Sequence, residues 1–221
     1  MDFVGSNSAV AGHPGPAGAA QTVAPLRDTV REGLKIVVVG GFGVGKTTMV
    51  RSVSEIRPLS TEEVMTEAGV GIDDAGGVRG KRTTTVAFDF GRISLNDQLV
   101  LYLFGAPGQE RFWFLWDRLF AGTLGAVVLV DTRRVEDSWY AIDRLEHQNL
   151  PFIVARNNFG PPTHTIDEVR DALSLNPDVP LVDCDARVRE SSKAVLIELV
   201  RHVHVLAEAA YGPAAGLVRQ P

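Results

Sequence analysis

One short segment combines residue types that bind phosphate groups. Residues 40–47 read Gly-Gly-Phe-Gly-Val-Gly-Lys-Thr and fit the G-x-x-x-x-G-K-[ST] pattern, in which glycines let backbone N–H groups turn toward phosphate oxygens. At this spacing the lysine ammonium would reach the β- and γ-phosphates, and the threonine hydroxyl would bind Mg²⁺. The sequence therefore predicts a nucleoside triphosphate site formed by Gly40, Gly41, Phe42, Gly43, Val44, Gly45, Lys46, Thr47 and Thr48.

The residues on either side of this loop have the pattern that such a site requires. Residues 34–39, Leu-Lys-Ile-Val-Val-Val, predict a buried strand, and a helix is expected over residues 46–56. A helix N-terminus adds partial positive charge where the phosphates would bind. An accidental glycine-rich turn is the alternative interpretation, and the agreement of both flanks with the motif argues against it.

Short apolar runs alternate with helical patterns along most of the chain. This alternation predicts an α/β P-loop fold, a mostly parallel six-stranded sheet with one antiparallel edge strand and helices on both faces. The antiparallel strand follows from the turn at Asn96 and Asp97, which predicts a hairpin, and Thr165 with Glu168 predicts a capping box. The expected strands cover residues 34–39, 86–90, 99–104, 126–130, 152–155 and 179–184, and the helices 46–56, 110–120, 135–148, 166–175 and 189–210.

Composition favours one soluble domain between two tails. The 221 residues are 45% hydrophobic and 22% charged, with a net charge of −5 that argues against nucleic acid as the main partner. We expect a nucleotide-binding domain over residues 31–210, flexible Gly/Ala/Pro-rich tails over 1–30 and 211–221, and no stable structure in 59–80. The single cysteine, Cys184, is expected to be buried. Neither a signal peptide nor a membrane span is predicted, which favours the cytoplasm.

Two further segments resemble a known family. Residues 82–90 read Arg-Thr-Thr-Thr-Val-Ala-Phe-Asp-Phe, and residues 104–112 read Phe-Gly-Ala-Pro-Gly-Gln-Glu-Arg-Phe. Together with the phosphate loop, they resemble the two switch regions of small Ras-like GTPases. The similarity is closest to the bacterial MglA-like branch, and within it to the actinobacterial conservon GTPases. It covers residues 33–207.

The resemblance implies a Ras-like fold and a molecular switch that binds GTP or GDP with Mg²⁺ and hydrolyses GTP slowly. The hydroxyl of Thr85 would join Thr47 in binding Mg²⁺, and the Gly108 N–H would contact the γ-phosphate. Gln109 would orient the attacking water, and Arg82 is the arginine that we expect to stabilise the transition state together with Lys46.

This chain departs from the family at the metal site. Gly105 stands where the family carries an aspartate that holds Mg²⁺ through water. The metal would then depend on Thr47, Thr85 and the phosphates, or on another carboxylate.

The base-reading motif departs as well. Asn157 and Asn158 match its first two positions, but Gly160 replaces the carboxylate that pairs with guanine. In the loop that would close over the base, Ala186 would donate its N–H to guanine O6 and Arg187 would stack on the ring. Asp185 before them, or Asp183, is a candidate replacement for the missing carboxylate.

These departures leave two rival functions open. One is a degenerate, non-hydrolysing scaffold that keeps the fold, and the other is a P-loop ATP-binding protein with relaxed base specificity. Intact Lys46, Thr47, Thr85 and Gln109 favour the GTPase, whereas Gly105 and Gly160 favour the rivals.

An aromatic segment follows the second switch. Helical spacing predicts a core stripe formed by Phe112, Trp116, Leu119 and Phe120, and it leaves Trp113 either in the core or exposed as an anchor for a protein partner. The resemblance implies a Roadblock-type partner protein and association with a sensor-kinase-like protein at the membrane.

Overall fold

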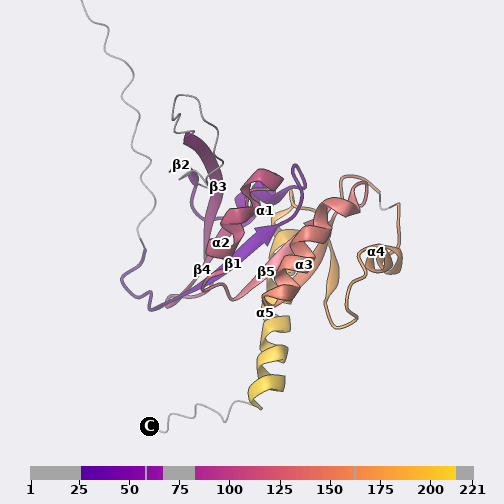
Figure 1. The fold of residues 1–221 in the computed structure, drawn as a ribbon. Coiled ribbons are helices and arrows are strands. Elements are labelled where there is room, and N and C mark those ends of the chain that lie inside the picture. The colour runs from indigo at the N-terminus through magenta and orange to yellow at the C-terminus, as the bar shows by residue number, and fades with distance from the viewer. Residues whose placement is uncertain (1–25, 58, 67–82, 162, 213–221) are drawn as a thin grey trace, which may run out of the picture.

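The computed structural model describes residues 26–57, 59–66, 83–161 and 163–212 (Figure 1). The strands are β1 (Glu32–Val39), β2 (Leu59–Thr66), β3 (Thr83–Ser94), β4 (Leu99–Gly105), β5 (Gly125–Val130), β6 (Phe152–Asn157) and β7 (Leu181–Cys184). The α-helices are α1 (Lys46–Val53), α2 (Trp116–Phe120), α3 (Trp139–His147), α4 (Ile166–Ala172) and α5 (Arg189–Tyr211). Two short 3-10 helices, η1 (Glu110–Leu115) and η2 (Val135–Ser138), lead into α2 and α3. Most of the two predicted tails, residues 1–25 and 213–221, lies outside the described part.

The strands form one sheet in the order β2-β3-β4-β1-β5-β6-β7. The predicted fold class is confirmed: β3 pairs antiparallel with both of its neighbours, and every other pairing is parallel. The six predicted strands are all present, and β2 adds a seventh beside β3. The antiparallel strand is therefore second from the edge, so its predicted edge position was wrong.

β2 also corrects the expectation that residues 59–80 lack stable structure. Its backbone pairs with β3 from Leu59 opposite Phe90 to Thr66 opposite Thr83. Backbone hydrogen bonds hold an edge strand whatever its side chains are, so the polar composition of this segment concealed it from pattern analysis. Residues 67–80 lie outside the described part.

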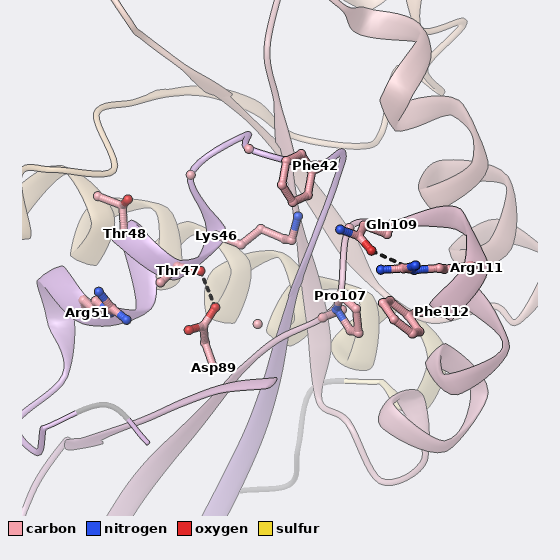
Figure 2. A pocket seen from close by; sticks show the side chains of 15 residues that line it. Phe42, Lys46, Thr47, Thr48, Arg51, Asp89, Pro107, Gln109, Arg111 and Phe112 are labelled. Carbon is pink, nitrogen blue, oxygen red and sulfur yellow. Dashed lines mark hydrogen bonds between the residues drawn. The ribbon is translucent and has the colours of Figure 1, made fainter. Parts of the chain in front are cut away.

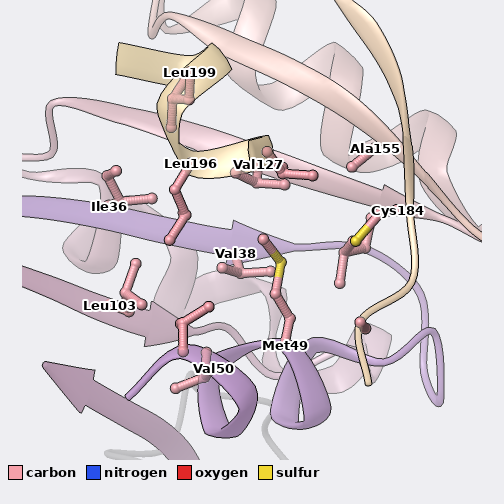
Figure 3. Close-up of a cluster of buried hydrophobic side chains, with 14 of the residues drawn as sticks. Ile36, Val38, Met49, Val50, Leu103, Val127, Ala155, Cys184, Leu196 and Leu199 are labelled. Carbon is pink, nitrogen blue, oxygen red and sulfur yellow. The ribbon is translucent and has the colours of Figure 1, made fainter. Parts of the chain in front are cut away.

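Two hydrophobic layers cover the sheet. Ile36 and Val38 of β1 point to one face, where they pack against Met49 and Val50 of α1 and Leu199 of α5 (Figure 3). The alternate residues of β1, Val37 and Val39, point to the other face and pack with residues of α2, α3 and α4. Strands covered on both faces need apolar residues at every position, which explains the continuous apolar runs of β1 and β5.

The predicted aromatic stripe after β4 is confirmed. Phe112, Trp116 and Phe120 are buried, and Leu119 is partly buried. The helix predicted over residues 110–120 begins as 3-10 helix and becomes α-helical only at Trp116. Trp116 also ties this segment to the preceding loop, because its indole N–H donates to the carbonyl of Pro107 over 3.1 Å.

Trp113 packs inside the domain. Its ring stacks on Tyr140 of α3 with centroids 3.7 Å apart and an angle of 8° between the planes. The exposed aromatic side chain of this segment is instead Phe114, with 53% of its surface accessible.

Several local predictions hold. Asn96 accepts backbone hydrogen bonds from Gln98 and Leu99 in the hairpin between β3 and β4. Thr165 and Glu168 form the capping box of α4, and Cys184 is buried, which raises the pKa of its thiol to about 11. Within the described residues, no helix combines the length and apolarity needed to cross a bilayer.

Leu145 offers a test of the layer between α3 and the sheet. Its side chain is fully buried, so Leu145→Ala should lower the free energy of unfolding by about 2–5 kcal/mol through lost burial and a residual cavity. Leu95, in the exposed hairpin turn, is the matched control, and Leu95→Ala should change stability by less than about 0.5 kcal/mol. Chemical denaturation measures both, and equal losses would contradict the proposed layer.

Candidate nucleotide-binding site

A cavity of about 600 Å³ opens at the carboxyl end of β1 (Figure 2). Ligands of parallel α/β sheets bind at this edge, where the loops after the strands meet. The phosphate loop, the middle of β3 and the segment after β4 all contribute to its wall. The lining residues are Phe42, Gly43, Gly45, Lys46, Thr47, Thr48, Arg51, Asp89, Gly105, Ala106, Pro107, Gly108, Gln109, Arg111 and Phe112.

The glycines of the phosphate loop are required by its geometry. Gly40 has a φ of +134° and Gly45 a φ of +108°, conformations that side chains disfavour. A Cβ on Gly40 would collide with the carbonyl oxygen of Leu129, and a Cβ on Gly45 would lie 2.5 Å from Nδ2 of Asn157. The loop therefore packs closely against the strand ends behind it, and α1 begins directly after it at Lys46.

Lys46 is buried at the centre of the loop. Its ammonium donates hydrogen bonds to the carbonyl oxygens of Gly40 at 2.8 Å and Gly41 at 2.6 Å. Burial lowers the pKa of Lys46 to about 8, against the opposing charges of Asp89 and Asp137. Negatively charged phosphates beside Nζ would stabilise the protonated form, so the site favours an anionic ligand.

A carboxylate that sequence analysis did not assign lies beside Thr47. The Thr47 hydroxyl donates a hydrogen bond to Oδ2 of Asp89 on β3 (Figure 2). Asp89 is the register partner of Gly105 across the β3–β4 pair, and a Cβ on Gly105 would lie 3.1 Å from the Cβ of Asp89. Asp89 thus brings a carboxylate to the place that Gly105 leaves without one.

Thr47 and Asp89 fit a Mg²⁺ ion, because a hydroxyl and a carboxylate on one side of a phosphate site are the hard oxygen ligands that this ion prefers. The described residues hold no group of three or more His, Cys, Asp or Glu side chains arranged for a metal. Thr47 and Asp89 would be the protein ligands of Mg²⁺, which keeps waters and phosphate oxygens as its other ligands. In the sequence, Asp89 is visible as the aspartate of the Phe-Asp-Phe strand. Only the strand register shows which residue Asp89 faces, so its place beside Thr47 could not be predicted.

Thr85 is not brought to this position. It lies on β3 opposite Val64 of β2, four residues before Asp89, or about 13 Å along an extended strand. Its role as a metal ligand stays a prediction. Arg82, the predicted transition-state arginine, lies outside the described residues.

The loop after β4 contacts the phosphate loop directly. A Cβ on Gly108 would lie 2.5 Å from Nζ of Lys46 and 2.8 Å from the carbonyl oxygen of Gly41. Gln109 also lines the cavity, and its Oε1 accepts a hydrogen bond of 2.9 Å from Nε of Arg111. The structure therefore brings the predicted residues Lys46, Gly108 and Gln109 together.

Asn157 connects the phosphate loop to the other side of the site. Its amide donates to the carbonyl of Val44 at 2.8 Å, and its Oδ1 accepts from the N–H of Ala186 at 3.0 Å. Both predicted residues are buried; Asn157 is the last residue of β6, and Ala186 lies in the loop after β7.

The neighbouring predicted residues have partners of their own. The backbone N–H of Asn158 donates to Cys184, and its side chain lies 3.3 Å from Oδ1 of Asp183. Asp185 pairs with Arg187 at 2.8 Å. No atom lies within 4 Å of a Cβ built on Gly160, so this position faces open space.

Two arginines near the phosphate loop, Arg133 and Arg134, have contacts outside the cavity. Arg134 donates to the carbonyl of Phe42 at 2.9 Å, and neither it nor Arg133 lines the cavity. Arg133 pairs with buried Asp131 and lies 4.4 Å from the centre of the Phe159 ring.

Comparison with known families agrees with this geometry. The family model described as "Conserved hypothetical ATP binding protein" matches residues 38–205, from the end of β1 through most of α5. The chain belongs to this family. Membership extends over the phosphate loop, Asp89, Gln109 and Asn157, and it identifies the protein as a nucleotide-binding P-loop protein.

Two individual proteins are similar to this member of the family. The uncharacterized protein MJ1339 of Methanocaldococcus jannaschii is 30% identical over 124 residues, which cover 55% of this chain and 68% of that protein. The FeoB G-domain from Methanococcus jannaschii is similar in structure, with a TM-score of 0.52, 14% identity, and coverage of 79% of this chain and 99% of that one. The structural similarity supports the P-loop fold.

Removal of the Asp89 charge should weaken Mg²⁺-dependent binding. We expect Asp89→Asn to lose on the order of 10–100-fold in nucleotide affinity when Mg²⁺ is present. In EDTA it should bind at least as well as the wild type, because one negative charge that repels the phosphates is gone. Fluorescent nucleotide titration measures both, with Asp97→Asn in the hairpin as the exposed control. An equal loss in Mg²⁺ and in EDTA would show that Asp89 acts only on the fold.

The lowered pKa of Lys46 predicts a pH effect on stability. Below pH 8 Lys46 is protonated in both the folded and the unfolded chain, whereas between about pH 8 and its ordinary pKa of 10.5 the unfolded chain keeps a proton that the folded chain has released. Stability therefore rises with pH in this window, by at most about 1.4 kcal/mol per pH unit. In chemical denaturation without nucleotide, the free energy of unfolding of the wild type should rise relative to that of Lys46→Met from pH 8 to 10. A constant difference between the two free energies would contradict the prediction.

Proposed function

We propose that this protein is a nucleotide-dependent switch that binds guanine nucleotides with Mg²⁺ and hydrolyses GTP slowly. The observation that carries the proposal is the contact of Gly108 with Lys46 and Gly41, where a Cβ would be only 2.5 Å from the lysine nitrogen. A γ-phosphate held by Lys46 would occupy the same small space.

This contact couples the ligand to the segment after β4. A terminal phosphate beside Nζ must draw Lys46 from the carbonyls of Gly40 and Gly41 or move the backbone of Gly108. Because Trp116 holds the carbonyl of Pro107, a movement at Gly108 extends to the aromatic segment. Loss of the phosphate would reverse it, which is how one bond cleavage can change a protein surface.

Hydrolysis needs an acceptor that orients the attacking water. Gln109 lines the cavity, and its Oε1 is held by Arg111. This oxygen has a second lone pair for a water, so Gln109 can position the nucleophile without leaving Arg111. Bound Mg²⁺ would neutralise charge on the phosphates, and Thr47 with Asp89 would hold it.

One rival has a specific observation in its favour. The family is described as ATP-binding, and Gly160 faces open space where the guanine-reading carboxylate would stand. An ATP-binding protein with relaxed base specificity is therefore the second candidate function. The non-hydrolysing scaffold is the third, and it predicts no turnover.

Partners and finer kinship are also proposals. We propose that the segment after Gln109 contacts a protein partner through exposed Phe114, and a Roadblock-type protein or a sensor-kinase-like protein at the membrane remains our candidate. Membership of the MglA-like branch, and of the conservon GTPases within it, is proposed on the residues of the two switch segments.

Gln109→Leu tests the proposed chemistry. We expect single-turnover GTP hydrolysis to fall at least tenfold, because leucine cannot accept a hydrogen bond from water, while GTP affinity stays within about threefold of wild type. Lys46→Ala is the control that should lose nucleotide affinity itself. Quenched-flow hydrolysis and fluorescent nucleotide titration give the two readouts.

The same assays separate the rivals. Faster turnover of ATP than of GTP would replace the guanine switch with the ATP-binding protein. Nucleotide binding without turnover of either triphosphate would leave the scaffold. Unchanged hydrolysis in Gln109→Leu would remove this residue from the mechanism.

A further inference from the structure

The loops after β6 and β7 form the side of the site away from Gly108. A Cβ on Gly45 would meet Asn157 at 2.5 Å and Ala186 at 3.5 Å, so both loops pack against the end of the phosphate loop. Gly108 marks the γ-phosphate side by its contact with Lys46, and Gln109 lines the same cavity. A triphosphate lying along the loop therefore directs its base toward Asn157 and Ala186.

Guanine presents two neighbouring donors, N1–H and the 2-amino group, and a carboxylate with both oxygens available accepts them best. The amide of Asn157 cannot do so, because its two ends are engaged with Val44 and Ala186. Among the described residues, the carboxylates at the carboxyl ends of the neighbouring strands are Asp131, Asp183 and Asp185.

Of these carboxylates, Asp131 is itself buried and Asp183 has a buried partner. Asp131 has a side chain only 4% exposed, and it accepts three hydrogen bonds from Arg133. Asp183 pairs with Arg156, whose side chain is 6% exposed, through Oδ1 at 2.6 Å. Release of this oxygen would leave a buried guanidinium without its counter-charge.

Asp185 accepts from Arg187 the same three hydrogen bonds that Asp131 accepts from Arg133, but its own side chain is more exposed than that of Asp131. Its partner Arg187 is two residues away. The Asp185 side chain is 29% exposed and the Arg187 side chain 66%. The exposed guanidinium can turn into solvent at little cost, which frees Oδ2 of Asp185 and leaves Oδ1 with a single hydrogen bond, from the backbone N–H of Arg187 at 3.0 Å. The backbone is fixed meanwhile, because the Asp185 N–H donates to Oγ of Ser191 at 2.9 Å in the first turn of α5.

We propose that Asp185 is the residue that reads guanine in this protein, in place of the carboxylate absent at Gly160. Without nucleotide, Arg187 keeps the carboxylate oriented. When the base binds, the guanidinium releases its hydrogen bonds to the carboxylate. The inference rests on the proposed function, since it needs a nucleotide in the site.

Replacement of the carboxylate by an amide gives a sharp test. Asp185→Asn should lose at least tenfold in GDP affinity, because its NH₂ group opposes the 2-amino group of guanine. It should gain at least tenfold for XDP, because xanthine offers a carbonyl oxygen there instead. Fluorescent GDP, XDP and ADP are titrated in Mg²⁺ against wild type, Asp185→Asn and Asp183→Asn.

Asp183→Asn is the matched control. It makes the same chemical change two residues away, beside Arg156, so we expect lower thermal stability with an unchanged order of base preference. Gain of XDP binding by Asp185→Asn alone would establish the proposal, and this gain cannot come from misfolding.

The other outcomes overturn it. A gain of XDP binding in Asp183→Asn would move the role to that residue. Equal affinity of the wild type for GDP and ADP would overturn the role of Asp185 in guanine recognition, but not nucleotide binding itself. Absence of binding of all three nucleotides by the wild type would overturn the proposed function as well.

Discussion

The hydrogen bonds of the Asn157 side-chain amide are the interaction on which the site depends, because they join the end of β6 to two loops that leave other strands. It donates to Val44 in the phosphate loop and accepts from Ala186 after β7, and it is itself buried at the end of β6. Parallel strands bring their carboxyl ends to one edge of the sheet, and the amide fixes how the loops meet there. The phosphate loop is thereby held at its Val44 end before any ligand is bound.

The opposite side of the site depends on strand register. Asp89 reaches Thr47 because β3 runs antiparallel to β4 and places this residue opposite Gly105. A side chain at Gly105 would press against the aspartate, so the glycine and the carboxylate form one arrangement. The same hydrogen bond links β3 to the start of α1, and it therefore links the strand to whatever occupies the phosphate loop.

The charges of the site explain why it suits an anion. Lys46 is held in a dry environment that lowers its pKa to about 8, and phosphates would restore its charge. Asp89 and Asp185 lie at opposite ends of the loop, each beside a hydroxyl or an arginine with which it forms a hydrogen bond. One end suits a metal and the other a base, as a nucleotide with Mg²⁺ requires.

The sequence by itself determined the fold class, the phosphate loop and the positions of Lys46, Thr47, Gln109 and Asn157, because glycine spacing and continuous apolar strands reflect local backbone geometry. It determined neither β2, which is held by backbone pairing, nor the break of the helix after β4 into 3-10 and α-helical parts. Only the tertiary structure decided that Asp89 faces Gly105 and that Asp183 is bound to buried Arg156 whereas Asp185 is not. These are relations between strands distant in sequence, and they depend on register and burial, which no local pattern records.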